Sequence, residues 1–284
     1  TVAMDQPSIG VWAGLAEQFS SLRTVRHDGE KVANQSREML RSSITQLILG
    51  YNFDSRWGVQ LNLPWIERRF RQATGGGSTT GRERGLGDAA LLARWVALDG
   101  VGPGNTLVRA TLRAGVKLPT GDSDRLAEAH GHGQESALHG HDLALGTGAI
   151  DFLAGGGLFA SKKRNFVSAS LDYTLRAEGD HDYRHADDLT VAAGLGRFLS
   201  PGGGEHRAAL ELLGTVQTKG QDRRGGVKVA GSALTAVYLG PRLLYSWRMS
   251  LAAELALEQP VLRNNSGTSL VPDHRLRAAV TWVF

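Results

Sequence analysis

Residues 167–176 read Val-Ser-Ala-Ser-Leu-Asp-Tyr-Thr-Leu-Arg, with an apolar side chain at every second position. Successive side chains of a β-strand point to opposite faces, so this stretch has one apolar and one polar face. A helix would mix the two sets around its surface. The stretch therefore predicts a β-strand.

The same alternation of period two recurs along the chain, at 57–65, 108–117 and 249–258 among other places. It predicts about twelve strands: 9–22, 38–53, 56–71, 86–98, 105–118, 146–160, 165–178, 187–199, 207–219, 229–245, 248–262 and 273–284. Most are longer than the roughly 5–6 residues usual in globular proteins. Their length suits a tilted crossing of a lipid bilayer, which needs about 9–11 residues.

The connections between these strands alternate between short turns and long polar segments. The long segments are 23–37, 72–85, 119–145, 179–186, 220–228 and 263–272. Short turns at one end and long loops at the other are typical of outer-membrane barrels. We therefore expect an all-β fold, a single domain over 1–284 that forms a closed antiparallel transmembrane β-barrel. An even strand number places the N- and C-termini on the periplasmic side, with 1–8 as a short periplasmic segment and 119–145 as a long extracellular loop.

The composition excludes several other classes of protein. The chain of 284 residues has 37 glycines and no cysteine, which excludes disulfides, thiolate metal sites and cysteine nucleophiles. No run of about 18 apolar residues occurs, so a transmembrane helix is excluded. The net charge of +4 is small and dispersed, which argues against a nucleic-acid partner.

Aromatic residues gather near the predicted short turns, as expected of a girdle at the periplasmic membrane boundary. They are Tyr51, Phe53, Trp57, Trp95, Phe159, Phe166, Phe198, Tyr245, Trp247, Trp282 and Phe284. The last strand alternates up to Phe284, which resembles the C-terminal signal read by the barrel assembly machinery. These features predict a location in the bacterial outer membrane, in contact with its lipid and lipopolysaccharide.

Three glycine-rich junctions carry a family resemblance. They are Gly-Leu-Gly-Asp-Ala (85–89), Gly-Val-Lys-Leu-Pro-Thr-Gly-Asp (115–122) and Leu-Gly-Thr-Gly-Ala-Ile-Asp-Phe (145–152). Together they resemble the outer-membrane family of "MetA-pathway of phenol degradation" transporters, over residues 38–284. The resemblance implies a small barrel that passes small organic solutes, with aromatic compounds among the candidates. The chain departs from that family by a histidine-rich insertion between the second and third motifs.

Six histidines in the long loops are candidate metal ligands. They are His130, His132, His139 and His141 in the insertion, with His181 and His185 in the next long loop. Imidazole suits Zn, Cu or Ni, and glycine within each His-Gly-His unit lets both rings turn toward one ion. The alternative is a hydrated loop that happens to use histidine. No cofactor is required by the predicted fold.

The polar faces of the strands supply candidate residues for the lumen or its constriction. They are Arg94, Arg109, Arg113, Lys117, Asp88, Asp151, Asp172, Arg176, Glu211, Glu254 and Glu258. The bases concentrate on 86–98 and 105–118, and the three glutamates lie far along the sheet. Closure of the barrel would set them across the lumen, where a transverse field selects solutes. The alternative is a salt-bridge network that merely fills a narrow barrel.

These features predict an outer-membrane channel or transporter that passes small solutes by passive or facilitated diffusion. A metal-binding outer-membrane protein is the first alternative and an outer-leaflet barrel enzyme the second. Ser136 lies near His139 and Asp142 in sequence, but no Gly-x-Ser-x-Gly nucleophile elbow occurs. We therefore expect the protein not to be an enzyme.

Overall fold

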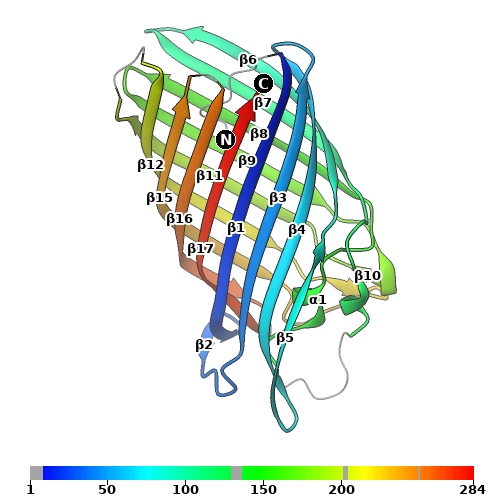
Figure 1. Cartoon of the computed structure of the whole chain (residues 1–284). Helices are drawn as coiled ribbons and strands as arrows, with labels where there is room; N and C mark the ends of the chain where they lie inside the picture. The colour runs from blue at the N-terminus through cyan, green and yellow to red at the C-terminus, as the bar shows by residue number, and fades with distance from the viewer. Residues whose placement is uncertain (1–8, 129–135, 201–203, 249) are drawn as a thin grey trace.

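The computed structural model describes residues 9–128, 136–200, 204–248 and 250–284. One antiparallel sheet of 14 strands closes on itself (Figure 1), and without the added strands β2 and β5 it is a barrel of twelve. The barrel strands are β1 (Gly10–His27), β3 (Met39–Asn52), β4 (Trp57–Thr74), β6 (Ala90–Gly102), β7 (Thr106–Lys117), β8 (Asp151–Lys162), β9 (Asn165–Leu175), β11 (Asp188–Phe198), β12 (His206–Lys219), β15 (Leu234–Trp247), β16 (Leu251–Asn265) and β17 (Thr268–Val283). The predicted closed barrel of twelve strands is confirmed.

Smaller elements lie between the barrel strands. They are β2 (Glu30–Val32), β5 (Gly77–Leu86), the 3-10 turns η1 (Asp124–Leu126) and η2 (Asp180–Asp182), the short helix α1 (Gly140–Leu143), and a separate sheet of β10 (Tyr183–Arg184), β13 (Arg223–Arg224) and β14 (Val227–Lys228). Within the described residues, no helix is long and apolar enough to cross a membrane.

The first and last barrel strands pair with each other and close the wall. Their register runs from Trp12 opposite Val283 to His27 opposite Thr268, and every pairing in the sheet is antiparallel. Lipid offers no hydrogen-bond partner to an open sheet edge, so a wall that crosses a membrane must close in this way.

The outer face of the barrel is apolar. Leu15, Leu47, Leu112, Leu171 and Leu195 all project outward and are at least 43% exposed. Residues of the opposite parity therefore face the interior, where they include charged and polar side chains. This arrangement explains a low mean hydropathy of −0.21 in a barrel with an apolar exterior.

The two ends of the barrel differ. Strand β1 begins and β17 ends at the end with the short turns 53–56, 103–105 and 163–164, which we call the short-turn end (Figure 1). The opposite end is the long-loop end.

Three predicted long loops are partly strand instead. Within 72–85 strand β4 pairs with β5, and within 23–37 strand β1 pairs with β2. Within 263–272, β16 extends to Asn265 and β17 begins at Thr268. These stretches are rich in polar residues, so period-two alternation could not reveal them.

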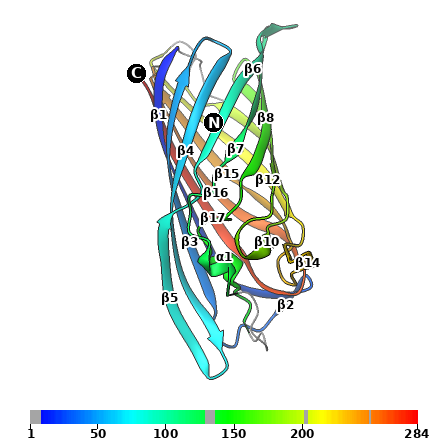
Figure 2. The same cartoon turned by 90° about the vertical axis from the view of Figure 1, so that its right-hand side faces the viewer.

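The wall is interrupted next to β5. Both β5 and β6 pair with β4, and residues 87–89 separate them. Among the described strands, β5 pairs only with β4, because β7 ends at Lys117 opposite Ala90. Beside β5, Arg125 contacts Glu83 and Leu145 lies against Gly85, so non-strand residues take the place of a neighbouring strand. Figure 2 shows β5 extending beyond the barrel rim.

Candidate functional site

The three glycine-rich junctions meet around the carboxylate of Asp88. Its Oδ2 atom accepts hydrogen bonds from Lys117 Nζ at 2.6 Å and from the Thr147 backbone N–H at 2.9 Å. Its Oδ1 atom accepts from the Gly121 N–H at 3.1 Å. One buried side chain therefore joins the end of β5, the end of β7 and the approach to β8.

Glycine is required where these junctions touch, because their backbones lie against one another. A Cβ atom at Gly121 would lie 2.9 Å from the Cα atom of Gly87, and one at Gly146 would overlap the Gly121 carbonyl oxygen. Contacts this short exclude a side chain unless the backbone moves. The motifs separated in sequence are thus parts of one packed junction.

Beyond this junction the described residues 136–145 fold into the barrel interior. Ala137, Leu138 and Leu143 are each 1% exposed and pack against the barrel residues Val25, Leu40, Phe70 and Leu270. Residues 136–145, which we call the plug, fill the long-loop half of the lumen. A hydrated loop, the alternative that the sequence left beside a metal site, does not describe these residues, because Ala137, Leu138 and Leu143 are buried. Alternating glycine and histidine conceals these three apolar anchors in the sequence.

Polar contacts secure the plug to the wall. The buried carboxylate of Glu38 accepts hydrogen bonds from Ser136 Oγ at 2.6 Å and from the Ala137 N–H at 3.0 Å. On β4, Arg68 donates to the Asp142 carbonyl oxygen and Gln72 donates to that of Leu138 at 3.0 Å. The Ser136 hydroxyl therefore has a structural role, since it hydrogen-bonds the plug to Glu38.

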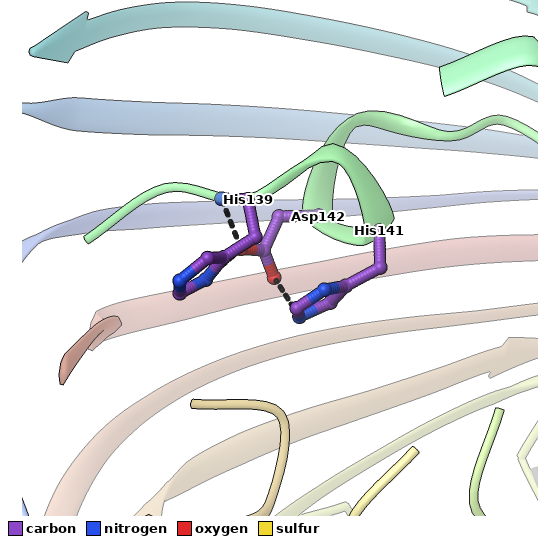
Figure 3. Close-up of side chains that lie close together, drawn as sticks. All are labelled: His139, His141 and Asp142. Atoms are coloured by element: carbon purple, nitrogen blue, oxygen red, sulfur yellow. Dashed lines mark hydrogen bonds and ion pairs between the residues drawn. The ribbon is translucent and has the colours of Figure 1, made fainter. Parts of the chain in front are cut away.

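Two histidines and an aspartate converge on helix α1, as Figure 3 shows. The rings of His139 and His141 stack with centroids 5.2 Å apart, and the Asp142 carboxylate lies 3.6 Å from His139 Nδ1 and 3.5 Å from His141 Nε2. Burial lowers the pKa of His141 to about 4, although the Asp142 carboxylate acts in the opposite direction. The His141 ring is therefore neutral at pH 7.

A second polar cluster faces the plug from the opposite wall, which β12 helps to form. Tyr183 donates to Asp222 Oδ2 at 2.6 Å, and Lys219 Nζ lies 2.9 Å from the same carboxylate. His185 Nδ1 lies 3.5 Å from Asp222, and the Tyr183 ring stacks on His141 with centroids 6.2 Å apart. Since β4 and β12 lie six strands apart in the order of the sheet, the plug bridges opposite sides of the lumen.

The six predicted metal ligands separate into three groups. His139 and His141 come together with Asp142, whereas His185 belongs to the cluster around Asp222. His181 is exposed on η2. His130 and His132 lie outside the described residues.

The predicted lumen residues all lie along the inner face, at or beside the strands, and most form ion pairs with neighbours. The pairs are Lys117 with Asp88 (2.6 Å) and Asp151 (2.8 Å), Arg176 with Asp151 (2.9 Å) and Asp188 (2.6 Å), Arg113 with Asp172, Arg109 with Asp99 (2.8 Å), Arg242 with Glu211 and Glu254, and Arg275 and Arg277 with Glu258 (2.9 and 2.8 Å). Arg94 donates to Asn52 at 2.7 Å.

Two of these bases, Arg242 and Arg275, were missing from the sequence prediction. The register places Arg242 directly opposite Glu211 and Arg275 directly opposite Glu258. Strand parity together with cross-strand pairing would have identified both. Their position neutralises two of the three glutamates locally, which reduces the field expected across the lumen.

An open cavity of about 220 Å³ remains in the short-turn half of the lumen. Its lining includes Trp12, Ile48 and Leu92, together with the charged residues Arg94, Arg113 and Glu254. Glu254 on β16 is five strands from Arg94 on β6, so opposite charges line different sides of this space.

Three aromatic residues predicted for the outer girdle lie inside the barrel. Phe159, Phe166 and Phe198 pack together with Ala209 and Leu244, with adjacent ring centroids 5.5 and 5.0 Å apart. The girdle assignment is wrong for them. Phe159 has the same strand parity as the inward-facing Asp151, so closeness to a turn was a weaker guide than parity.

Comparison with known proteins supports the fold. The chain is similar to the COG4313 outer membrane channel from Pseudomonas putida F1, with 16% identity, a TM-score of 0.67 and coverage of 99% of this chain and 98% of that one. It is also similar to the β domain of the Bordetella autotransporter BrkA, with 12% identity, a TM-score of 0.51 and coverage of 98% and 100%. No protein-family model and no curated protein sequence matches. The chain therefore has the fold of a bacterial outer-membrane β-barrel, and the particular family suggested by its glycine motifs stays a prediction.

Proposed function

We propose that this barrel is an outer-membrane diffusion channel for small, partly apolar organic solutes. The observation that carries the proposal is the cavity of about 220 Å³ in the lumen, lined by both apolar and charged side chains. A barrel that served only as a membrane anchor would have no need of such a space. The similar Pseudomonas putida protein is itself an outer membrane channel, which agrees with this function.

The cavity restricts the size and chemistry of the solute. Pockets for drug-sized ligands usually hold about 300–1,000 Å³, so this one favours smaller molecules. Trp12, Ile48 and Leu92 offer apolar contact, and Arg94, Arg113 and Glu254 offer polar contact. Small aromatic compounds with one polar group fit this combination.

The plug acts as the gate in this proposal. It fills the long-loop half of the lumen through Leu138 and Leu143 and through the contacts of Glu38, Arg68 and Gln72. Passage of a solute along the barrel requires the plug to move. Diffusion therefore depends on the free energy that holds the plug in place.

An enzymatic role has little support from the described residues. The Ser136 hydroxyl donates to Glu38, and Ser123 donates to Asp180 at 2.6 Å. Both hydroxyls therefore donate to carboxylates rather than to a histidine base, which nucleophilic catalysis by serine requires. We therefore propose a channel without catalytic activity.

Planar-bilayer recordings test the function. The decisive variant replaces residues 136–145 by a Gly/Ser linker of equal length, and a control replaces the exposed residues 30–33 in the same way. We expect discrete conductance steps at least several-fold larger in the plug variant than in wild type, with no change in the control. A folded plug variant that shows no steps under any ionic condition would contradict the channel.

A further inference from the structure

The group of His139, His141 and Asp142 has the composition and compactness of a metal site. One ligand atom from each residue lies within 4.8 Å of the other two. The backbone enforces this proximity, since His139 is the N-cap residue of α1 and its N–H donates to the Asp142 carboxylate at 3.0 Å. The carboxylate is therefore held between the two rings (Figure 3).

A second observation concerns the His141 ring. Its side chain is 5% exposed, and its Nδ1 atom is buried without a hydrogen-bond partner among the described residues. A buried polar atom that lacks a partner is costly and calls for an explanation. A cation held directly by this nitrogen would provide one, because a neutral imidazole nitrogen binds Zn, Cu or Ni through its lone pair.

We propose that His139, His141 and Asp142 bind a divalent transition-metal ion of the Zn, Cu or Ni class. Two imidazoles and one carboxylate are typical ligands for these ions, and they disfavour Ca and Mg, which prefer oxygen alone. Tetrahedral zinc ligands lie about 3.4 Å apart at bond lengths near 2.1 Å. Small rotations of the three side chains close the present separations to that value.

The location gives such an ion a consequence for the barrel. All three ligands belong to the plug, and the cluster lies between Arg68 on β4 and Tyr183 on the opposite side. An ion that binds only this arrangement stabilises the plugged state by mass action. The metal would thus stabilise the plug in place, and its binding can be measured without any recording of solute passage.

Calorimetry on the complete, detergent-solubilised protein tests the site with Zn²⁺ as the probe. We expect one ion per chain, and at least tenfold weaker binding in His139→Ala and in His141→Ala. The matched control is His181→Ala, which removes an exposed loop histidine outside the cluster. The double variant His130→Ala/His132→Ala tests the remaining histidines of the same segment, and we expect both controls to bind as wild type does.

Electron paramagnetic resonance with Cu²⁺ identifies the ligand atoms in the wild-type protein itself. We expect hyperfine coupling to two imidazole nitrogens in wild type and to one in His141→Gln. Either of two results would overturn the proposal: Zn²⁺ affinity that survives the His139→Ala/His141→Ala double variant, or affinity that falls equally in the two controls. Neither measurement uses conductance, so failure of the metal site and failure of the channel remain distinguishable.

Discussion

Glu38 shows how a single side chain can position a whole segment. It lies between β2 and β3 and is 5% exposed, and its carboxylate accepts hydrogen bonds from Ser136, from the Ala137 N–H and from the Ala73 N–H at 2.9 Å. It therefore ties the start of the plug to the end of β4. Nothing near position 38 in the sequence indicates this role, because its partners lie 35 to 99 residues away.

We predict that Glu38→Gln loosens the plug. The backbone N–H groups of Ala73 and Ala137 donate to different carboxylate oxygens, so the amide, with one oxygen, must lose one of these two bonds. A hydrogen bond to a charged group is worth about 1.5–3 kcal/mol. We expect at least tenfold faster tryptic cleavage after Arg125, measured on the folded barrel. Glu30→Gln, on the exposed strand β2, is the control. Equal cleavage rates in the two variants would show that Glu38 does not hold the plug.

A buried histidine, His185, makes the loops at the long-loop end of the barrel sensitive to acid. Burial lowers the pKa of His185, although Asp222 acts in the opposite direction; Lys219 and Arg176 lower it further. Just below pH 6.5, His185 therefore binds a proton when the loops are unfolded but not when they are folded. The free energy of unfolding falls as the pH drops through this window.

Thermal melts of wild type and His185→Gln between about pH 7.5 and 5 check this expectation. We predict that wild type loses stability on acidification and that the variant loses less, because one of its titrating groups is gone. His206→Gln, at the short-turn end, serves as the control. The same pH dependence in wild type and His185→Gln would refute the role of His185.

At the scale of elements, the junction of the three glycine-rich motifs determines where strand pairing in the barrel wall ends. Gly87, Gly121 and Gly146 let three backbones meet, and Asp88 joins them by hydrogen bonds. The segment that follows β7 therefore turns into the lumen rather than pairing with β5. The glycine motifs were recognisable in the sequence, but their meeting point depends on the closure of the barrel.

We predict that Gly146→Ala destabilises the barrel by about 1–3 kcal/mol, the usual cost of overpacking a tight contact. Its Cβ atom would overlap the Gly121 carbonyl oxygen, whereas a Cβ atom at Gly76 would meet nothing within 4 Å. Chemical denaturation of Gly146→Ala beside Gly76→Ala measures the difference. Unchanged stability in Gly146→Ala would mean that the junction can yield.

At the scale of the whole molecule, the lumen has three zones. Aromatic packing around Phe166 fills one side near the short-turn end, the plug fills the long-loop half, and the cavity lies between Arg94 and Glu254. Local ion pairs neutralise Glu211 and Glu258, so in the proposed channel the charges that line the cavity would carry the remaining selectivity. The transverse field predicted from the sequence is thus reduced to a few groups.

We predict that these groups set the ion selectivity of the open channel. Glu254→Gln should shift the reversal potential in a salt gradient toward anion preference, and Arg94→Gln should shift it toward cation preference. Arg248→Gln changes an exposed turn residue and should have no effect. The recordings use the variant with the plug replaced, and identical reversal potentials in all of them would contradict this assignment.

The sequence by itself determined the barrel. Period-two alternation is a local property of each strand, so 167–176 and its counterparts revealed strand number, facing and closure without knowledge of any contact. It also placed Asp88, Arg113 and Glu254 on the inner face. Where alternation was absent, as in the β4–β5 hairpin, the prediction failed.

Only the tertiary structure decided what occupies the interior. The plug, the pairing of Arg242 with Glu211 and the convergence of His141 with Asp222 through Tyr183 all join residues from distant parts of the chain. The plug is an irregular segment that turns its apolar side chains toward the wall and its polar groups toward its own turns. Its apolar residues therefore follow no regular spacing that could be recognised in the sequence. Barrel closure brings the opposite walls together, and their contacts then determine the path of the loop.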